Sequence, residues 1–198
     1  MLRLTTFLRN GFTIIELVIA IGFLAILVSM ALFVTDPFEG VRLKRDSNLS
    51  KDAETIVEGI NNFYIARGKL PWSSNLNSRD NANPFSWHKT TNVEVGICEN
   101  EDCSKPGILV TEGLIPSGLP SQHISADKSD AIYLGKGQGS QSPVYACFVP
   151  TSETERKKTG ELYKININTN FPLTGALESC PSTVTWEDED VCYVCVAK

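Results

Sequence analysis

Six cysteines carry the clearest chemistry in this chain of 198 residues. Six cysteines allow about fifteen pairings, and an even number in an exported domain predicts disulfide bonds. Two of them lie three residues apart in a strand-like run, so they face opposite sides and should not bond to each other. Another two bracket four residues and can close a small loop. In chain order the six are Cys98, Cys103, Cys147, Cys180, Cys192 and Cys195.

The spacing leaves part of the pairing open. With Cys98 bonded to Cys103, Cys147 and Cys180 pair with Cys192 and Cys195 in either order. Zinc is the competing interpretation, because Cys-x4-Cys and Cys-x2-Cys together supply four thiolates. Export favours disulfides and a reducing compartment favours zinc. We therefore predict three disulfides and no metal for an exported domain.

Other residues with reactive side chains give no pattern typical of an enzyme. His88 and His123 are the only histidines, and neither belongs to a Ser/His/Asp or Cys/His arrangement. Residues Gly135 to Gly139 lack the phosphate-loop spacing and predict a flexible turn. The acidic run from Glu187 to Asp190 could offer oxygen ligands to calcium, but it lacks a calcium-loop spacing and favours a solvated turn. We predict no catalytic residues and no cofactor, with calcium as the weaker alternative.

The N-terminal region combines a long apolar run with one carboxylate. A helix from Phe12 to Val34 is about 35 Å long, enough to cross a hydrocarbon core of about 30 Å. Glu16 lies near the start of this run. An unpaired carboxylate inside such a segment costs about 2.5 to 3.5 kcal/mol. Glu16 therefore needs a partner.

The residues around Glu16 resemble the N-terminus of type IV pilins and of the pseudopilins of type II secretion. In that family a membrane aspartyl peptidase cuts after a glycine and methylates the new amine. The resemblance implies a cut between Gly11 and Phe12. The matching residues are a leader with Arg3 and Arg9, then Gly11, Phe12, Thr13, Ile14, Ile15, Glu16 and Leu17, followed by apolar sequence to Val34.

Each part of this motif has a physical reason. Gly11 has no side chain, so an extended backbone can lie in a protease cleft without steric conflict. After cleavage, Phe12 carries an ammonium group that is a natural counterion for Glu16 of a neighbouring subunit. The cost of burying Glu16 is then offset only on assembly, and the pairing helps to set the axial stagger between subunits.

The apolar run has two other interpretations, a cleaved signal peptide and an ordinary membrane anchor. A cleaved signal peptide has an apolar region of about 7 to 15 residues and a small-residue cleavage site, whereas this run is longer and lacks such a site. An ordinary membrane anchor explains neither the Gly11-Phe12 pair nor Glu16. Basic residues both precede and follow the run, so charge leaves the orientation open, and the resemblance alone places the C-terminus outside the cytoplasm.

Length and charge fit one exported domain behind this segment. The predicted organisation is a leader over residues 1–11, a transmembrane or filament-core helix over 12–35 and an exported globular domain over 36–198. About 160 residues are enough for a single domain with its own core. The formal net charge of -5 gives no basic footprint for nucleic acid.

A second helix is predicted after a break. Pro37 and Gly40 should interrupt the first helix, and Gly68 followed by Pro71 should end the second. Residues 61–71 also resemble the end of the long helix of major pseudopilins. Apolar residues recur at spacings of three and four between these breaks, which predicts an amphipathic helix. They are Leu49, Ala53, Ile56, Val57, Ile60, Phe63 and Tyr64.

The remaining sequence predicts a loop and a small sheet. Residues 73–92 are rich in Ser, Asn, Asp and Pro and predict a long surface loop. Residues 107–120 resemble the short helix and turn that precede the sheet in pilin folds. Three or four antiparallel strands are then predicted. The candidate strands are residues 131–134, 144–149, 162–167 and 191–196.

The predicted fold is α+β. A long N-terminal helix, with a hydrophobic stalk and an amphipathic half, packs on a small antiparallel sheet, giving the pilin-like lollipop. A C-terminal disulfide that holds the last loop is common in pilins, so the resemblance favours the pair Cys180 and Cys192.

The predicted function is that of a structural subunit of a type IV pilus-like filament. A pseudopilin of type II secretion and a minor or initiating pilin are alternatives. An alternative of another class is a membrane-anchored extracellular enzyme or binding module. The expected partners are further copies of the chain, a prepilin peptidase, an assembly platform and the membrane, with no nucleic acid. The expected location is the inner membrane, as a single pass with the C-terminal domain outside the cytoplasm, and afterwards a cell-surface or periplasmic filament.

The Gly11-Phe12 pair predicts that the mature chain begins at Phe12 with a methylated amine. Gly11→Val should block processing, because a branched side chain clashes in a cleft that accepts glycine. Intact mass of the purified subunit distinguishes the two forms. Wild-type protein that still begins at Met1 in cells with an active prepilin peptidase would contradict the prediction.

Overall fold

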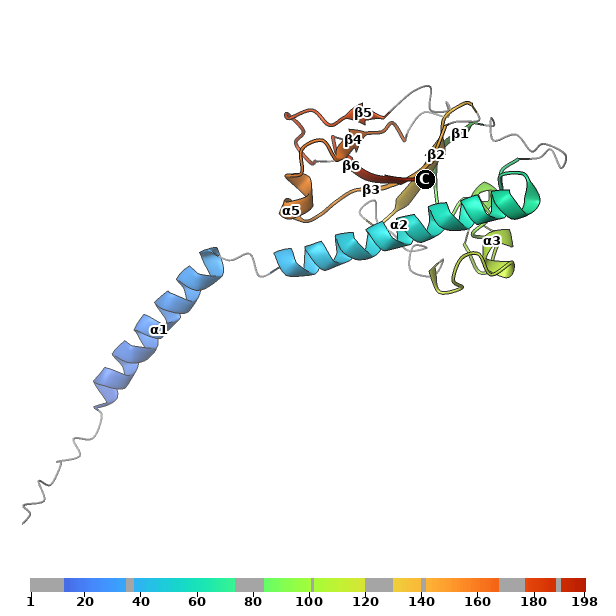
Figure 1. The fold of residues 1–198 in the computed structure, drawn as a ribbon. Helices are drawn as coiled ribbons and strands as arrows, with labels where there is room; N and C mark the ends of the chain where they lie inside the picture. Colours follow the sequence, from blue (N-terminus) through green and yellow to red (C-terminus); the bar gives the residue numbers. More distant parts are fainter. Residues whose placement is uncertain are drawn as a thin grey trace, which may run out of the picture. The chain divides into compact units, whose positions relative to one another are not determined.

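A computed structural model describes residues 13–34, 38–73, 84–100, 102–119, 130–139, 142–167, 177–187 and 190–198. The chain divides into two compact units, one ending at Glu39 and the other running from Gly40 to Lys198 (Figure 1). The first unit contains helix α1, and the second contains the sheet and the remaining helices. Each unit is described by itself.

Helix α1 spans Ile14–Val34 and is apolar on every side. Its described side chains, from Ile14 to Met30, are all exposed. Phe23, for example, is 65 % exposed. A helix that is hydrophobic all round is normally buried by other protein or by lipid.

Helix α2 spans Glu39–Arg67 and supplies the helical side of the main core. Gly68 follows with φ of 69°, a left-handed conformation that suits glycine, and its N–H donates to the Tyr64 carbonyl at 2.7 Å. The predicted apolar stripe is therefore an inward face, with only Tyr64 half-buried. The buried members are Leu49, Ala53, Ile56, Val57, Ile60 and Phe63.

Among the described residues, six strands form one sheet, and all neighbouring strands are antiparallel. Figure 1 shows α2 running beside this sheet. In spatial order the strands are β1 (Phe85–Lys89), β2 (Ile132–Lys136), β3 (Val144–Phe148), β6 (Tyr193–Ala197), β4 (Leu162–Lys164) and β5 (Glu178–Ser179). The short helices are η1 (Val93–Val95), α3 (Ile108–Thr111) and α5 (Glu153–Arg156).

Alternate residues of the central strands enter two different apolar clusters. Ile132 and Leu134 of β2 join the stripe of α2, whereas Tyr133 between them lies in a second cluster. On β3, Ala146 and Cys147 divide in the same way. This period of two is the pattern expected for strands that bury side chains on both faces.

Asp46 attaches the first half of α2 to the segment after β3. Its side chain is buried and accepts hydrogen bonds from the N–H groups of Thr151 and Ser152, at 3.0 and 2.8 Å, and from the Thr151 hydroxyl at 3.0 Å. The neighbouring Arg45 donates to Asp130 and to the Thr151 hydroxyl. Because a buried carboxylate requires such donors, this network fixes the position of α2 along the sheet.

The predicted lollipop fold is wrong in its stalk and in its sheet. Helices α1 and α2 are separate elements with Pro37 between them in the sequence, where an N–H for continuing a helix is missing. Among the residues that the structure describes, no helix has both the length and the apolarity needed to cross a membrane. The sheet has six strands where three or four were predicted.

Two local predictions also fail. The segment 73–92 contains β1, in which Phe85 and Trp87 alternate as buried residues. The glycine-rich turn begins later than predicted, because Gly135 and Lys136 belong to β2. A Cβ on Gly135 would lie 2.6 Å from the Trp87 ring, so glycine is needed where the tryptophan of β1 crosses β2.

We expect Asp46→Ala to lower the free energy of unfolding by about 2 to 4 kcal/mol, because the buried N–H of Ser152 and the partly buried N–H of Thr151 lose their acceptor. Urea denaturation of the oxidised chain measures the change. Glu54→Ala, at an exposed position on the same helix, is the control and should change stability by less than about 0.5 kcal/mol. Equal effects of the two substitutions would contradict the role given to Asp46.

Candidate functional site

Glu16 forms a capping box at the start of α1. The N–H and hydroxyl of Thr13 donate to its carboxylate at 3.0 and 2.9 Å, and the N–H of Glu16 donates to the Thr13 hydroxyl at 3.3 Å. This reciprocal pair satisfies donors that the first helical turn leaves open. The sequence pattern that predicts this cap is Thr-x-x-Glu directly before an apolar run, and the sequence interpretation overlooked it. Gly11 and Phe12 lie outside the described residues.

The apolar surface of α1 is exposed and contains the predicted site residue Glu16. Its described side chains contact nothing that buries them, and a Cβ added at Gly22 would meet no atom within 4 Å. Contiguous apolar surface of this extent marks a site of protein or membrane interaction. Glu16 stands at one end of it, with its side chain exposed.

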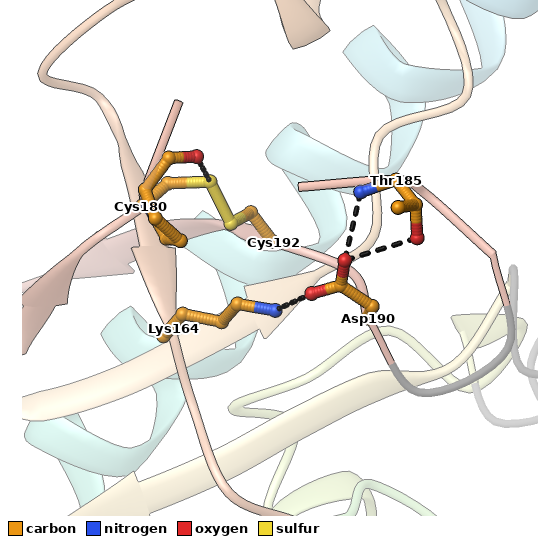
Figure 2. Close-up of a disulfide and its surroundings, with 6 residues drawn as sticks. Lys164, Cys180, Thr185, Asp190 and Cys192 are labelled. Carbon is orange, nitrogen blue, oxygen red and sulfur yellow. Dashed lines mark hydrogen bonds and ion pairs between the residues drawn. A yellow bond between two sulfur atoms is a disulfide. The ribbon is translucent and has the colours of Figure 1, made fainter. Parts of the chain in front are cut away.

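The six cysteines form three disulfides, and none is free. Cys147 and Cys195 face each other across β3 and β6, which explains their bond. Cys180, directly after β5, is bonded to Cys192, directly before β6 (Figure 2). The third bridge closes the short loop from Cys98 to Cys103. With their thiols oxidised, these residues are not zinc ligands.

Asp190 organises the acidic C-terminal turn through a cationic side chain. Lys164 of β4 donates to one carboxylate oxygen at 2.6 Å, and the N–H and hydroxyl of Thr185 donate to the other at 2.8 and 2.9 Å (Figure 2). These hydrogen bonds, above all that of Lys164, lower the pKa of Asp190 to about 2. Of the other acidic residues here, Asp188 and Glu189 lie outside the described residues. Within the described part of the chain, no cluster of three His, Cys, Asp or Glu could hold a metal ion.

His88, the histidine that the structure describes, lies against an aromatic ring and a backbone carbonyl of β1. His88 stacks on Phe85 at 4.7 Å between ring centres, and its Nδ1 lies 2.8 Å from the Ser86 carbonyl oxygen. His123 lies outside the described residues. His88 therefore serves as part of the β1 packing.

Lys136 is a buried residue that the sequence interpretation overlooked. Its ammonium group donates to the carbonyls of Gly137 and Gly139, at 3.0 Å each, and so shapes the glycine-rich turn. The sequence pattern that predicts its burial is the alternation of side chains along β2. Lys136 lies two residues beyond Leu134 and therefore on the same inward face of the strand.

Comparison with family models, with curated proteins and with solved structures finds no match to this chain.

Asp190→Asn should lower the urea midpoint at pH 7, because the amide loses the charge-assisted bond from Lys164. The native carboxyl has a depressed pKa, so its stabilisation is complete above about pH 4 and is lost as the pH falls through 2. The difference between wild type and variant should therefore shrink below pH 4. Glu178→Gln, an exposed control on β5, should show little difference throughout. A difference for Asp190→Asn that stays constant from pH 7 to 2 would contradict this.

Proposed function

We propose that this chain is a structural subunit of a type IV pilus-like filament, matured by a prepilin peptidase and added to the filament by an assembly platform. The observation that carries the proposal is an exposed apolar helix with a carboxylate at its first turn, directly after a Gly-Phe pair. The role is structural, and we propose no reaction for the chain.

Further copies of α1 are the packing partners that best match the exposed apolar surface of α1. Another α1 offers matching apolar side chains, and the amine of a mature Phe12 offers a positive charge for Glu16. A partner of unrelated sequence would meet the apolar surface but would not account for the carboxylate. Assembly through α1 thus gives a reason for both features.

Three disulfides in the unit from Gly40 to Lys198 support a location outside the cytoplasm. We propose that the subunit is bound to the inner membrane before assembly, with this unit outside the cytoplasm. The finished filament would lie in the periplasm or at the cell surface.

A pseudopilin of type II secretion is the second candidate. The resemblance of residues 61–71 to the end of the long helix of major pseudopilins favours it. In the structure this segment is the C-terminal end of α2 and its exit, where Phe63 and Leu70 are buried. Both candidates share the same assembly chemistry, so the test below applies to each.

Substitutions at Glu16 separate helix capping from charge pairing. Glu16→Gln retains an oxygen for the capping box but has no charge, and Thr13→Ala removes the hydroxyl of the capping box but keeps the carboxylate. If Glu16 pairs with the Phe12 ammonium of a neighbour, Glu16→Leu and Glu16→Gln should both be absent from sheared filaments. Thr13→Ala should still assemble. Immunoblots of sheared and cell-bound fractions measure the distribution.

All three variants should remain in the cell-bound fraction at wild-type amounts, which controls for expression. Assembly by Glu16→Gln together with failure of Thr13→Ala would show that capping is the role of Glu16, against the pairing mechanism. Wild-type filament yield from Glu16→Leu would refute the pairing mechanism, and absence of the wild-type chain from sheared filaments would overturn the filament-subunit proposal and favour the membrane-anchored module.

A further inference from the structure

A cleft with an acidic rim lies at the C-terminal end of α2. It has a volume of about 370 Å³ and is built from the exit of α2, helix η1, the first disulfide loop and the start of α3. Its two ionisable lining residues are both acidic and exposed. The lining residues that carry the argument are Trp72, Val93, Glu94, Cys98, Glu99 and Ile108.

The walls of this cleft are fixed before any partner arrives. Trp72 stacks on Phe85 with ring centres 4.4 Å apart, and Cys98 is held by its disulfide. The N–H of Gly107 donates to the Ile97 carbonyl at 2.7 Å, which joins the segment after η1 to the start of α3. A preformed cleft avoids the ordering cost that weakens binding to loose surfaces.

Two features of the rim identify the chemistry of its partner. Val93 and Ile108 are 42 % and 44 % exposed, which is unusual for large apolar side chains beside a formed cleft. Glu94 and Glu99 add negative charge to the same rim. The matching partner has an exposed apolar side chain next to a basic one.

An exposed apolar side chain next to a basic one is present at the N-terminal end of α2. Val41 is 68 % exposed and Lys44 is also exposed, and a spacing of three places both on one side of the helix. About 25 helical residues separate them from the cleft, which is about 38 Å. Figure 1 shows the start of α2 and helix α3 at opposite ends of this unit. The two surfaces cannot meet within one chain.

We propose that the acidic cleft binds the Val41–Lys44 side of α2 from a second copy of the chain. Val41 packs on Val93 and Ile108, and Lys44 pairs with Glu94 and Glu99. Because different surfaces meet, the contact is head-to-tail and can repeat without closing, as an extended filament requires. This inference rests on the proposed function and names the contact between the globular units.

Charge reversal in the full-length chain tests the contact. Lys44→Glu, or Glu94→Lys combined with Glu99→Lys, should lower the yield of sheared filaments by about five-fold or more. The three substitutions together restore opposite charges and should return the yield to within about two-fold of wild type. Lys51→Glu and Glu54→Lys are matched controls on exposed positions of α2 and should leave the yield unchanged.

Wild-type yield from the charge-reversed variants would overturn the proposed contact. Loss of assembly without recovery in the combined variant would also overturn it, because the two surfaces would then bind different partners. Neither result affects the filament-subunit proposal, which depends on the presence of the wild-type chain in sheared filaments. The amount of oxidised subunit in whole cells confirms that each variant folds.

Discussion

Helix α1 carries apolar side chains around its whole circumference, and those described from Ile14 to Met30 are all exposed. Apolar surface left in water costs about 25 cal/mol per Å² relative to burial, so a helix of this kind does not remain uncovered in a cell. Helix α2 differs, because its apolar stripe is buried by the sheet and the loops of its own unit. The chain thus combines a unit with its own core and a helix whose cover must come from elsewhere. We propose that a filament of identical copies provides that cover.

The unit from Gly40 to Lys198 is suited to transmit contacts along such an array. Asp46 fixes α2 against the segment after β3, and the disulfides hold the centre and the C-terminal end of the sheet. The exposed basic start of α2 and the acidic cleft therefore belong to one compact unit.

The sequence predicted those elements whose apolar periodicity matches their burial. The stripe of α2 and the strands β2, β3 and β6 have this property, because each contributes alternate or periodic residues to a core. Strand β1 was overlooked, since Ser, Asn and Pro around Phe85 and Trp87 are typical of loops. Strand β5 has two residues, too few for any pattern. The bond between Lys164 and Asp190 joins residues 26 positions apart, which only the folded chain brings together. The stalk prediction is wrong because α1 and α2 are separate helices and no helix in the described part of the chain has the length and apolarity to cross a membrane.

Cryo-electron microscopy of filaments sheared from cells that express this chain tests the central claim most directly. The account predicts a helical filament in which α1 helices pack together at the centre and the Phe12 nitrogen of one subunit lies within about 4 Å of the Glu16 carboxylate of another. Filaments that lack this chain, or that contain it with α1 outside the centre, would contradict the account.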